Sequence, residues 1–114
     1  ELVPLIEDGD HETAMRCASE YIDARVGEVQ GVILGCTHYT VLREGLQERY
    51  QGRLRIFSQD EIIPKKLAQY LSTHRTLNLQ LSREGTRSIH LTEHRDRYDE
   101  IITTLLKGHG VSGE

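Results

Sequence analysis

The sequence predicts an α/β fold built from parallel βαβ units. Two apolar runs, Gly31–Gly35 and Leu54–Phe57, have the composition of buried strands, and a segment with apolar residues at helical spacing follows each of them. Strands that alternate with helices in this way form parallel sheets. At 114 residues the chain can bury one modest core.

The N-terminal part is expected to contain a strand followed by a helix. Leu2–Ile6 is short and apolar, which favours a strand. Asp10 is suited to cap the next helix, and Gly27 fits its end. The expected buried face of this helix consists of Ala14, Met15, Ala18, Tyr21 and Ile22.

The central strand, Gly31–Gly35, is rich in β-branched residues and is expected to be covered on both faces. The helix after it should end near Gly52 and bury Val41, Leu42, Leu46 and Tyr50. Leu54–Phe57 is expected to form the next strand. The helix that follows should bury Ile62, Ile63, Leu67, Tyr70 and Leu71, with Pro64 tolerated only in its first turn.

The last third is more polar. Leu77, Leu79 and Leu81 alternate with polar residues, which predicts a half-exposed strand or an extended segment. Ser88–Thr92 is expected to be another short strand. A final helix is predicted from the spacing of Tyr98, Ile101, Ile102, Leu105 and Leu106.

Composition excludes several classes of function. The net charge of −4 gives no basic surface for nucleic acid or an anionic membrane, so we expect neither as a partner. No apolar run approaches the roughly twenty residues of a membrane span, and the N-terminus does not resemble a signal peptide. Because the chain starts directly at an apolar run, without Met, we interpret Glu1 as a cut within a longer protein.

The two cysteines, Cys17 and Cys36, lie nineteen positions apart and form no CxxC motif. They are too few for a disulfide framework and have the wrong spacing for a zinc ribbon. Free thiols are typical of a reducing compartment, so we expect a cytoplasmic protein.

The candidate site is the segment Gly35-Cys36-Thr37-His38, at the carboxyl end of the central strand, where ligands bind in such sheets. Cys36 precedes a helix, whose free N–H groups favour a thiolate. His38 is able to accept or return a proton, and Thr37 offers a hydroxyl group. Gly35 allows a sharp turn and the close approach of a substrate. Cys17, in an amphipathic helix, is expected to be a packing residue.

Four segments resemble the glutamate racemase family: LVPLIEDG, GVILGCTHYTVL, RIFSQDEII and SIHLTEHRDRYDEIITTLLKG. The LGCTH part is the most specific, and the resemblance covers essentially the whole chain. A family member is about twice as long, so the resemblance implies that the N-terminal half is absent. Thr40 stands where the family usually has Pro, and Gln59 where it often has Gly; both are expected near the site rather than in it.

The resemblance implies a two-lobed aspartate/glutamate racemase-like fold. Residues 1–57 would belong to the second lobe, which carries the GCTH motif. Residues 58–114 would form a crossover helix and a strand-helix segment that returns to the first lobe. The chain would then need its N-terminal half or form a homo-oligomer.

The resemblance also implies an activity, the interconversion of L- and D-glutamate, which supplies D-glutamate for peptidoglycan. The family transfers the α-proton between two cysteines without a cofactor. Cys36 would be one of the two, assisted by His38, with Glu7 as an acidic partner and with Thr37 and Gly35 in the substrate site. The second cysteine belongs to the absent half, so this chain alone should be inactive.

Alternatives remain from other classes. One alternative is a module that binds a small carboxylate without turnover, and another is a cysteine hydrolase that uses Cys36 and His38. Within the racemase family, the alternative is an aspartate racemase. Residues two apart rarely form a competent Cys–His pair by themselves. We expect no metal site, because His90 and His94 span a strand-to-turn segment rather than one helix face.

Overall fold

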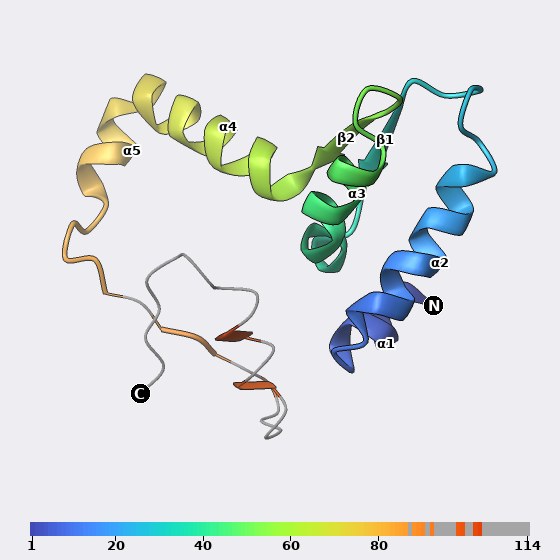
Figure 1. Ribbon diagram of the computed structural model, residues 1–114. Helices are drawn as coiled ribbons and strands as arrows, with labels where there is room; N and C mark the ends of the chain where they lie inside the picture. Colours follow the sequence, from blue (N-terminus) through green and yellow to red (C-terminus); the bar gives the residue numbers. More distant parts are fainter. Residues whose placement is uncertain (87, 91, 93–97, 100–101, 104–114) are drawn as a thin grey trace. The chain divides into compact units, whose positions relative to one another are not determined.

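The computed structural model describes residues 1–86, 88–90, 92, 98–99 and 102–103. Within them the chain has an α/β fold with a two-stranded parallel sheet (Figure 1). The chain forms two compact units, Glu1–Arg75 and Thr76–Glu114. The first unit contains the sheet and the candidate site. The expected division into lobes at residue 57 concerns a longer protein and stays a prediction.

The sheet pairs β1, Gly31–Leu34, with β2, Arg55–Ser58, in parallel. Both strands are therefore confirmed, with β2 displaced by one residue. Gly31 lies opposite Arg55 at one end of the pair, and Leu34 lies opposite Ser58 at the other. A Cβ at Gly31 would lie 2.9 Å from the carbonyl oxygen of Arg55, so the close approach of the two strands requires glycine there.

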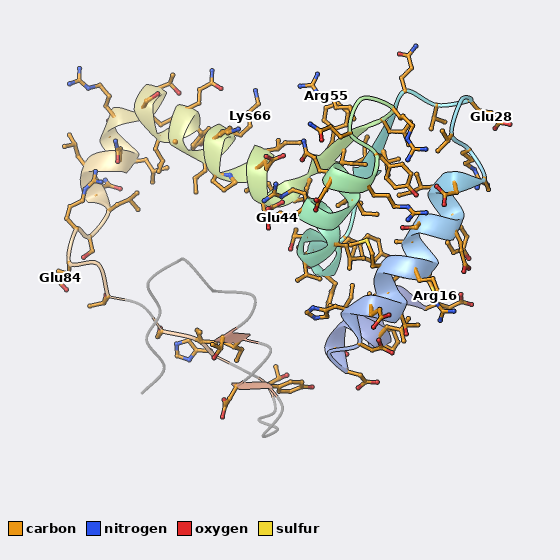
Figure 2. The ribbon with its side chains drawn as sticks, viewed as in Figure 1. Arg16, Glu28, Glu44, Arg55, Lys66 and Glu84 are labelled. Atoms are coloured by element: carbon orange, nitrogen blue, oxygen red, sulfur yellow. The ribbon has the colours of Figure 1, made fainter. Side chains whose placement is uncertain are left out.

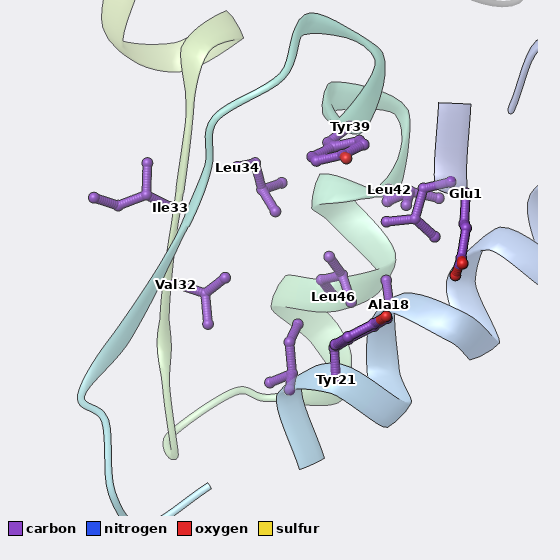
Figure 3. A pocket seen from close by; sticks show the side chains of 11 residues that line it. Glu1, Ala18, Tyr21, Val32, Ile33, Leu34, Tyr39, Leu42 and Leu46 are labelled. Atoms are coloured by element: carbon purple, nitrogen blue, oxygen red, sulfur yellow. The ribbon is translucent and has the colours of Figure 1, made fainter. Parts of the chain in front are cut away.

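Only one face of the sheet is covered within the described residues, so the expectation of a doubly covered central strand is wrong. Leu34 points into the core, whereas Ile33, on the opposite face, is 79% exposed (Figure 3). Neighbouring side chains of a strand point to opposite faces, which explains this contrast.

The core lies between the sheet and four helical segments: α1 (Leu2–Glu7), α2 (His11–Asp23), the 3₁₀ helix η1 (Thr37–Leu42) and α3 (Arg43–Arg49). As predicted, Asp10 caps α2, its carboxylate accepting a hydrogen bond from the Thr13 N–H at 3.1 Å. The helix ends earlier than expected, and Gly27, with a φ of 96°, occupies the turn that follows. The buried apolar residues are Ile6, Ala14, Ala18, Ile22, Leu34, Leu42, Leu46, Tyr50, Leu54 and Ile56.

The predicted strand at Leu2–Ile6 is wrong, because this segment is the helix α1. Short apolar runs fit either structure, and in α1 the residues Leu2, Leu5 and Ile6 share one helical face against the core. Pro4 lies in the first turn, where it removes no helical hydrogen bond. The helical form brings Glu7 to the end of α1, next to the candidate site.

The helix after β2 is confirmed as α4, Gln59–Thr73, but its packing is not as predicted. None of its residues is buried, and Ile62, Ile63, Leu67 and Tyr70 are 44–55% exposed. Its side chains, Lys66 among them, extend into open space (Figure 2). Pro64 is the sixth residue of the helix rather than part of its first turn, because α4 begins directly after β2. The apolar face of α4 therefore has no covering element in the described part of the chain.

The predicted strand at Leu77–Leu81 is also wrong, since α5, Arg75–Gln80, is helical and exposes Leu77 and Leu79. A period-two pattern indicates a strand only where a partner strand exists to pair with it. Ser88, Ile89 and His90 are not in a strand, and Leu91 lies outside the described residues. Of the final helix, Tyr98 and Ile102 are helical, while Ile101, Leu105 and Leu106 lie outside the described residues.

A polar clamp joins α2 to the end of α3. The Tyr50 hydroxyl lies 2.8 Å from Asp23 Oδ1 and 3.1 Å from the Ser19 carbonyl oxygen, and its one proton serves these two acceptors. The Arg49 guanidinium donates to Asp23 Oδ2 at 2.8 Å. The hydrogen bond from Arg49, followed by that from Tyr50, holds the pKa of Asp23 below its ordinary value of 3.8.

The clamp makes the free energy of unfolding depend on pH. Because the Asp23 carboxyl binds its proton less readily when folded, its contribution is present above about pH 4 and is lost as the pH falls through the lower folded-state pKa. We expect Asp23→Asn to make acid unfolding less steep below pH 4, measured by circular dichroism. Tyr50→Phe should lower the free energy of unfolding by about 1–2 kcal/mol at neutral pH, because it removes the hydroxyl that donates to Asp23 and to the Ser19 carbonyl oxygen.

Glu28→Gln is the matched control for the acid titration, since Glu28 is an exposed carboxylate in the loop after α2 (Figure 2). Its acid unfolding should follow that of the unaltered chain. An Asp23→Asn variant as steep as that control would show that the clamp does not contribute.

Candidate active site

The candidate site lies at the carboxyl edge of the sheet. β1 ends at Leu34 and β2 ends opposite it at Ser58, so the segments that follow, Gly35-Cys36 and Gln59-Asp60, leave the sheet from the same edge. Cys36 has an extended backbone, with φ −119° and ψ 141°, and directly precedes η1. The predicted location of Cys36, between a strand and a helix, is therefore confirmed, although the helix begins as a 3₁₀ turn.

A chain of three side chains starts at this thiol. Cys36 Sγ lies 3.7 Å from His38 Nδ1, and His38 Nε2 lies 3.1 Å from Glu7 Oε1. An ionised carboxylate only accepts hydrogen bonds, so Nε2 carries the proton that is donated to Glu7. In a neutral imidazole, Nδ1 is then left as an acceptor facing the thiol. The arrangement suits proton exchange between Cys36 and His38.

Two of these three side chains are accessible to solvent. The side chains of His38 and Glu7 are 37% and 45% exposed, and Cys36 is half-buried. A polar contact at this exposure contributes little to stability. Its effect is to orient the imidazole ring and to fix its tautomer.

The remaining predicted residues are placed differently. Thr37 is exposed, and its carbonyl oxygen accepts a hydrogen bond from the Thr40 hydroxyl at 2.8 Å. The φ of Gly35 is not positive and a Cβ there would meet nothing within 4 Å, and the chain bends at the next residue, Cys36. Open space at Gly35 is consistent with a nearby ligand. Cys17 is half-buried in α2, as Cys36 is at the sheet edge, so burial does not distinguish the two thiols.

One contact at the site was not expected from the sequence. The Gln59 side-chain amide donates a hydrogen bond to the Gly35 carbonyl oxygen at 3.1 Å, so Gln59 is part of the site loop rather than merely near it. The signal was present in the sequence, because Gln59 directly follows a strand that ends at the same edge as the central one. Nearby, Arg43 pairs with Asp60 at 2.8 Å and with Glu61 at 3.6 Å, which ties α3 to the start of α4.

An apolar cavity of about 370 Å³ lies elsewhere, between β1, α2 and α3 (Figure 3). Val32, Leu34 and Leu46 point into it, and neither Cys36 nor His38 lines it. Glu1, Tyr21 and Tyr39 also line it, but the thiol and imidazole of the candidate site lie at the sheet edge and not in this cavity.

The described residues contain no group of three or more His, Cys, Asp or Glu side chains arranged to hold a metal ion. His90 Nε2 lies 2.9 Å from the Ser88 hydroxyl, and His94, its possible co-ligand, lies outside the described residues. None of the helices in the described part of the chain is both long and apolar enough to cross a membrane.

The chain is similar to several curated glutamate racemases. It is 37% identical over 79 residues to the protein of Chlorobaculum parvum, an alignment that covers 67% of this chain and 29% of the relative. Identity with the Dinoroseobacter shibae protein is 33%, covering 64% of this chain and 28% of the relative. With the Persephonella marina protein it is 32% over 102 residues, covering 87% of this chain and 36% of the relative.

No family model matches the chain, and no solved structure matches it. The aligned region spans only about a third of the length of the curated relatives. Within that limit the sequence similarity is consistent between relatives from different organisms, at 32–37% identity. The chain is therefore similar, over about a third of their length, to proteins named glutamate racemase, as a fragment of such a protein would be.

Proposed function

We propose that this chain is a segment of a racemase that interconverts L- and D-glutamate by transferring the proton of the α-carbon. The observation that carries the proposal is the thiol–imidazole–carboxylate chain of Cys36, His38 and Glu7 at the sheet edge. The similarity to proteins named glutamate racemase supports glutamate as the substrate. Supply of D-glutamate for peptidoglycan is part of the same proposal.

Racemisation needs a base on one face of the α-carbon and an acid on the other. A thiolate removes the α-proton, the electron pair stays on the substrate as a carbanion, and a thiol on the opposite face returns a proton. Cys36 would fill one of these two roles. His38 would hold the thiol proton on Nδ1 whenever Cys36 is the thiolate, while Nε2–H remains hydrogen-bonded to Glu7. The step uses only thiol and imidazole protons, so the proposed mechanism requires no cofactor.

The substrate would lie over the exposed edge of the loop. Thr37 is exposed there, and the open space beside Gly35 would allow a carboxylate to approach the backbone. Stabilisation of the developing carbanion depends on donors placed in advance around it. Such donors on the second face would come from polypeptide outside this chain.

The second acid or base also has to come from outside the chain. Cys17 is a residue of α2, in the middle of a helix that packs on the core, and not of the sheet edge. The apolar face of α4, with Ile63, Leu67 and Tyr70 about half exposed, supports a requirement for further polypeptide or a second copy. We therefore propose that the chain alone does not racemise glutamate.

A cysteine hydrolase is a second candidate, because Cys36, His38 and Glu7 also have the order nucleophile, base and orienting acid. The 3.7 Å contact between residues only two apart favours this reading more than the sequence did. The similarity to glutamate racemases supports proton transfer instead. An acyl-enzyme trapped on Cys36 with an activated ester would favour the hydrolase, and a carboxylate bound without turnover by the longer protein would favour a binding module.

Cys36 should be the reactive thiol of this chain. We expect iodoacetamide at neutral pH to label Cys36 faster than Cys17, because His38 accepts the thiol proton. His38→Asn should slow labelling of Cys36 by about tenfold and leave Cys17 unchanged, since a hydrogen bond to a charged group is worth about 1.5–3 kcal/mol. Peptide mapping of the folded chain measures both rates. Faster labelling of Cys17 would contradict the assignment.

The racemase proposal is tested with the protein that contains this segment at its full length. We expect it to interconvert L- and D-glutamate, followed by circular dichroism, and to act on aspartate more slowly. Cys36→Ser should lower the rate by at least about a hundredfold, within the range of a general acid or base. Cys17→Ser is the matched control and should stay within about twofold of the unaltered protein.

The 114-residue chain alone should leave the optical signal of L-glutamate unchanged. Loss of that signal with the isolated chain would show that it carries both proton-transferring groups. A full-length protein that binds glutamate but does not invert it would replace the racemase proposal with the binding module.

A further inference from the structure

We infer that Gln59 is a positioning residue for the Cys36 thiol; this inference rests on the proposed function, in which that thiol transfers a proton. The Gln59 side-chain amide donates to the Gly35 carbonyl oxygen at 3.1 Å. That carbonyl belongs to the peptide bond that joins Gly35 to Cys36. Gln59 therefore restrains the orientation of the peptide bond that directly precedes the Cα atom of Cys36.

The peptide at Gly35 needs such a contact. Gly35 has no side chain to pack against a neighbour, and none of the described residues outside its immediate neighbours would meet a Cβ there within 4 Å. Glycine also has more backbone conformations available to it than any other residue. A hydrogen bond from a neighbouring element is the device that restricts this peptide in the described structure.

Gln59 is itself well anchored. It is the first residue of α4 and directly follows Ser58, which pairs with Leu34 in the sheet. The next two residues, Asp60 and Glu61, pair with Arg43 at the start of α3 at 2.8 and 3.6 Å. The amide donor is therefore held by the sheet on one side and by an ion-pair cluster on the other.

The orientation of this peptide determines where the thiol points. A net change in ψ of Gly35 or in φ of Cys36, now −119°, reorients the Cα–Cβ bond of Cys36 relative to the end of β1. The 3.7 Å contact between Sγ and His38 Nδ1 depends on that direction. Without the Gln59 donor, the contact should be formed for a smaller fraction of the time.

The test is a double-mutant cycle that measures the rate of Cys36 alkylation by iodoacetamide in the folded chain. The four proteins compared are the unaltered chain, Gln59→Ala, His38→Asn and the double variant. We expect Gln59→Ala to slow labelling by roughly three- to tenfold, the equivalent of one ordinary hydrogen bond. In the His38→Asn background the same substitution should have no effect, because the contact that Gln59 maintains is already gone. A purely structural role would slow labelling equally in both backgrounds.

Gln69→Ala is the matched control, since Gln69 is an exposed glutamine of the same helix, and it should leave the rate unchanged. If Gln59→Ala melts at a lower temperature than this control, Gln59→Met, which keeps the length but removes the donor, is measured instead. Equal rates of Cys36 labelling for Gln59→Ala and Gln69→Ala would overturn the role of Gln59 but leave the proposed function standing. A Cys36 that reacts no faster than Cys17 in the unaltered chain overturns the proposed function instead.

Discussion

The parallel pairing of β1 with β2 is the constraint on which the rest of the first unit depends. The pairing aligns Leu34 with Ser58, so both strands end at one edge, and the loop that carries Cys36 lies beside the start of α4. It requires glycine at position 31, where the Arg55 carbonyl leaves no room for a side chain. The core covers one face of this pair, and the thiol and its neighbours occupy the edge. The pairing of β1 with β2 therefore determines the position of both the core and the candidate site.

The site also depends on a contact between segments far apart in the sequence. Glu7 is the last residue of α1, and α1 packs its apolar face on the core. That packing brings the carboxylate to 3.1 Å from His38, thirty-one residues later. A strand at Leu2–Ile6 would have had to pair with the sheet, and that strand pairing would then have determined the position of Glu7. Packing of the helix α1 on the core, rather than strand pairing, thus determines the position of Glu7 beside His38.

Several features that depend on short stretches of sequence were predicted correctly. The strands, the Asp10 cap of α2 and the position of Cys36 follow from β-branched runs, capping chemistry and the strand-to-helix boundary. Leu2–Ile6 was assigned wrongly because a five-residue apolar run fits a helix equally well. Burial on α4 was predicted from periodicity alone, and periodicity does not show whether a covering element is present. The strand before Gln59 indicated the sheet edge at which this residue lies, whereas its hydrogen bond to Gly35 depends on the register of the two strands.

The most direct test of the proposed proton relay is the tautomer of His38. Donation from Nε2 to Glu7 and acceptance at Nδ1 from the Cys36 thiol require the neutral ring to carry its proton on Nε2. Nitrogen-15 chemical shifts of the imidazole in the labelled chain report this proton directly. We expect the Nε2–H form in the unaltered chain and a mixture of tautomers in Glu7→Gln, whose amide is able to donate as well as accept. A neutral ring protonated on Nδ1 would contradict the relay, because Cys36 would then face a donor instead of a base.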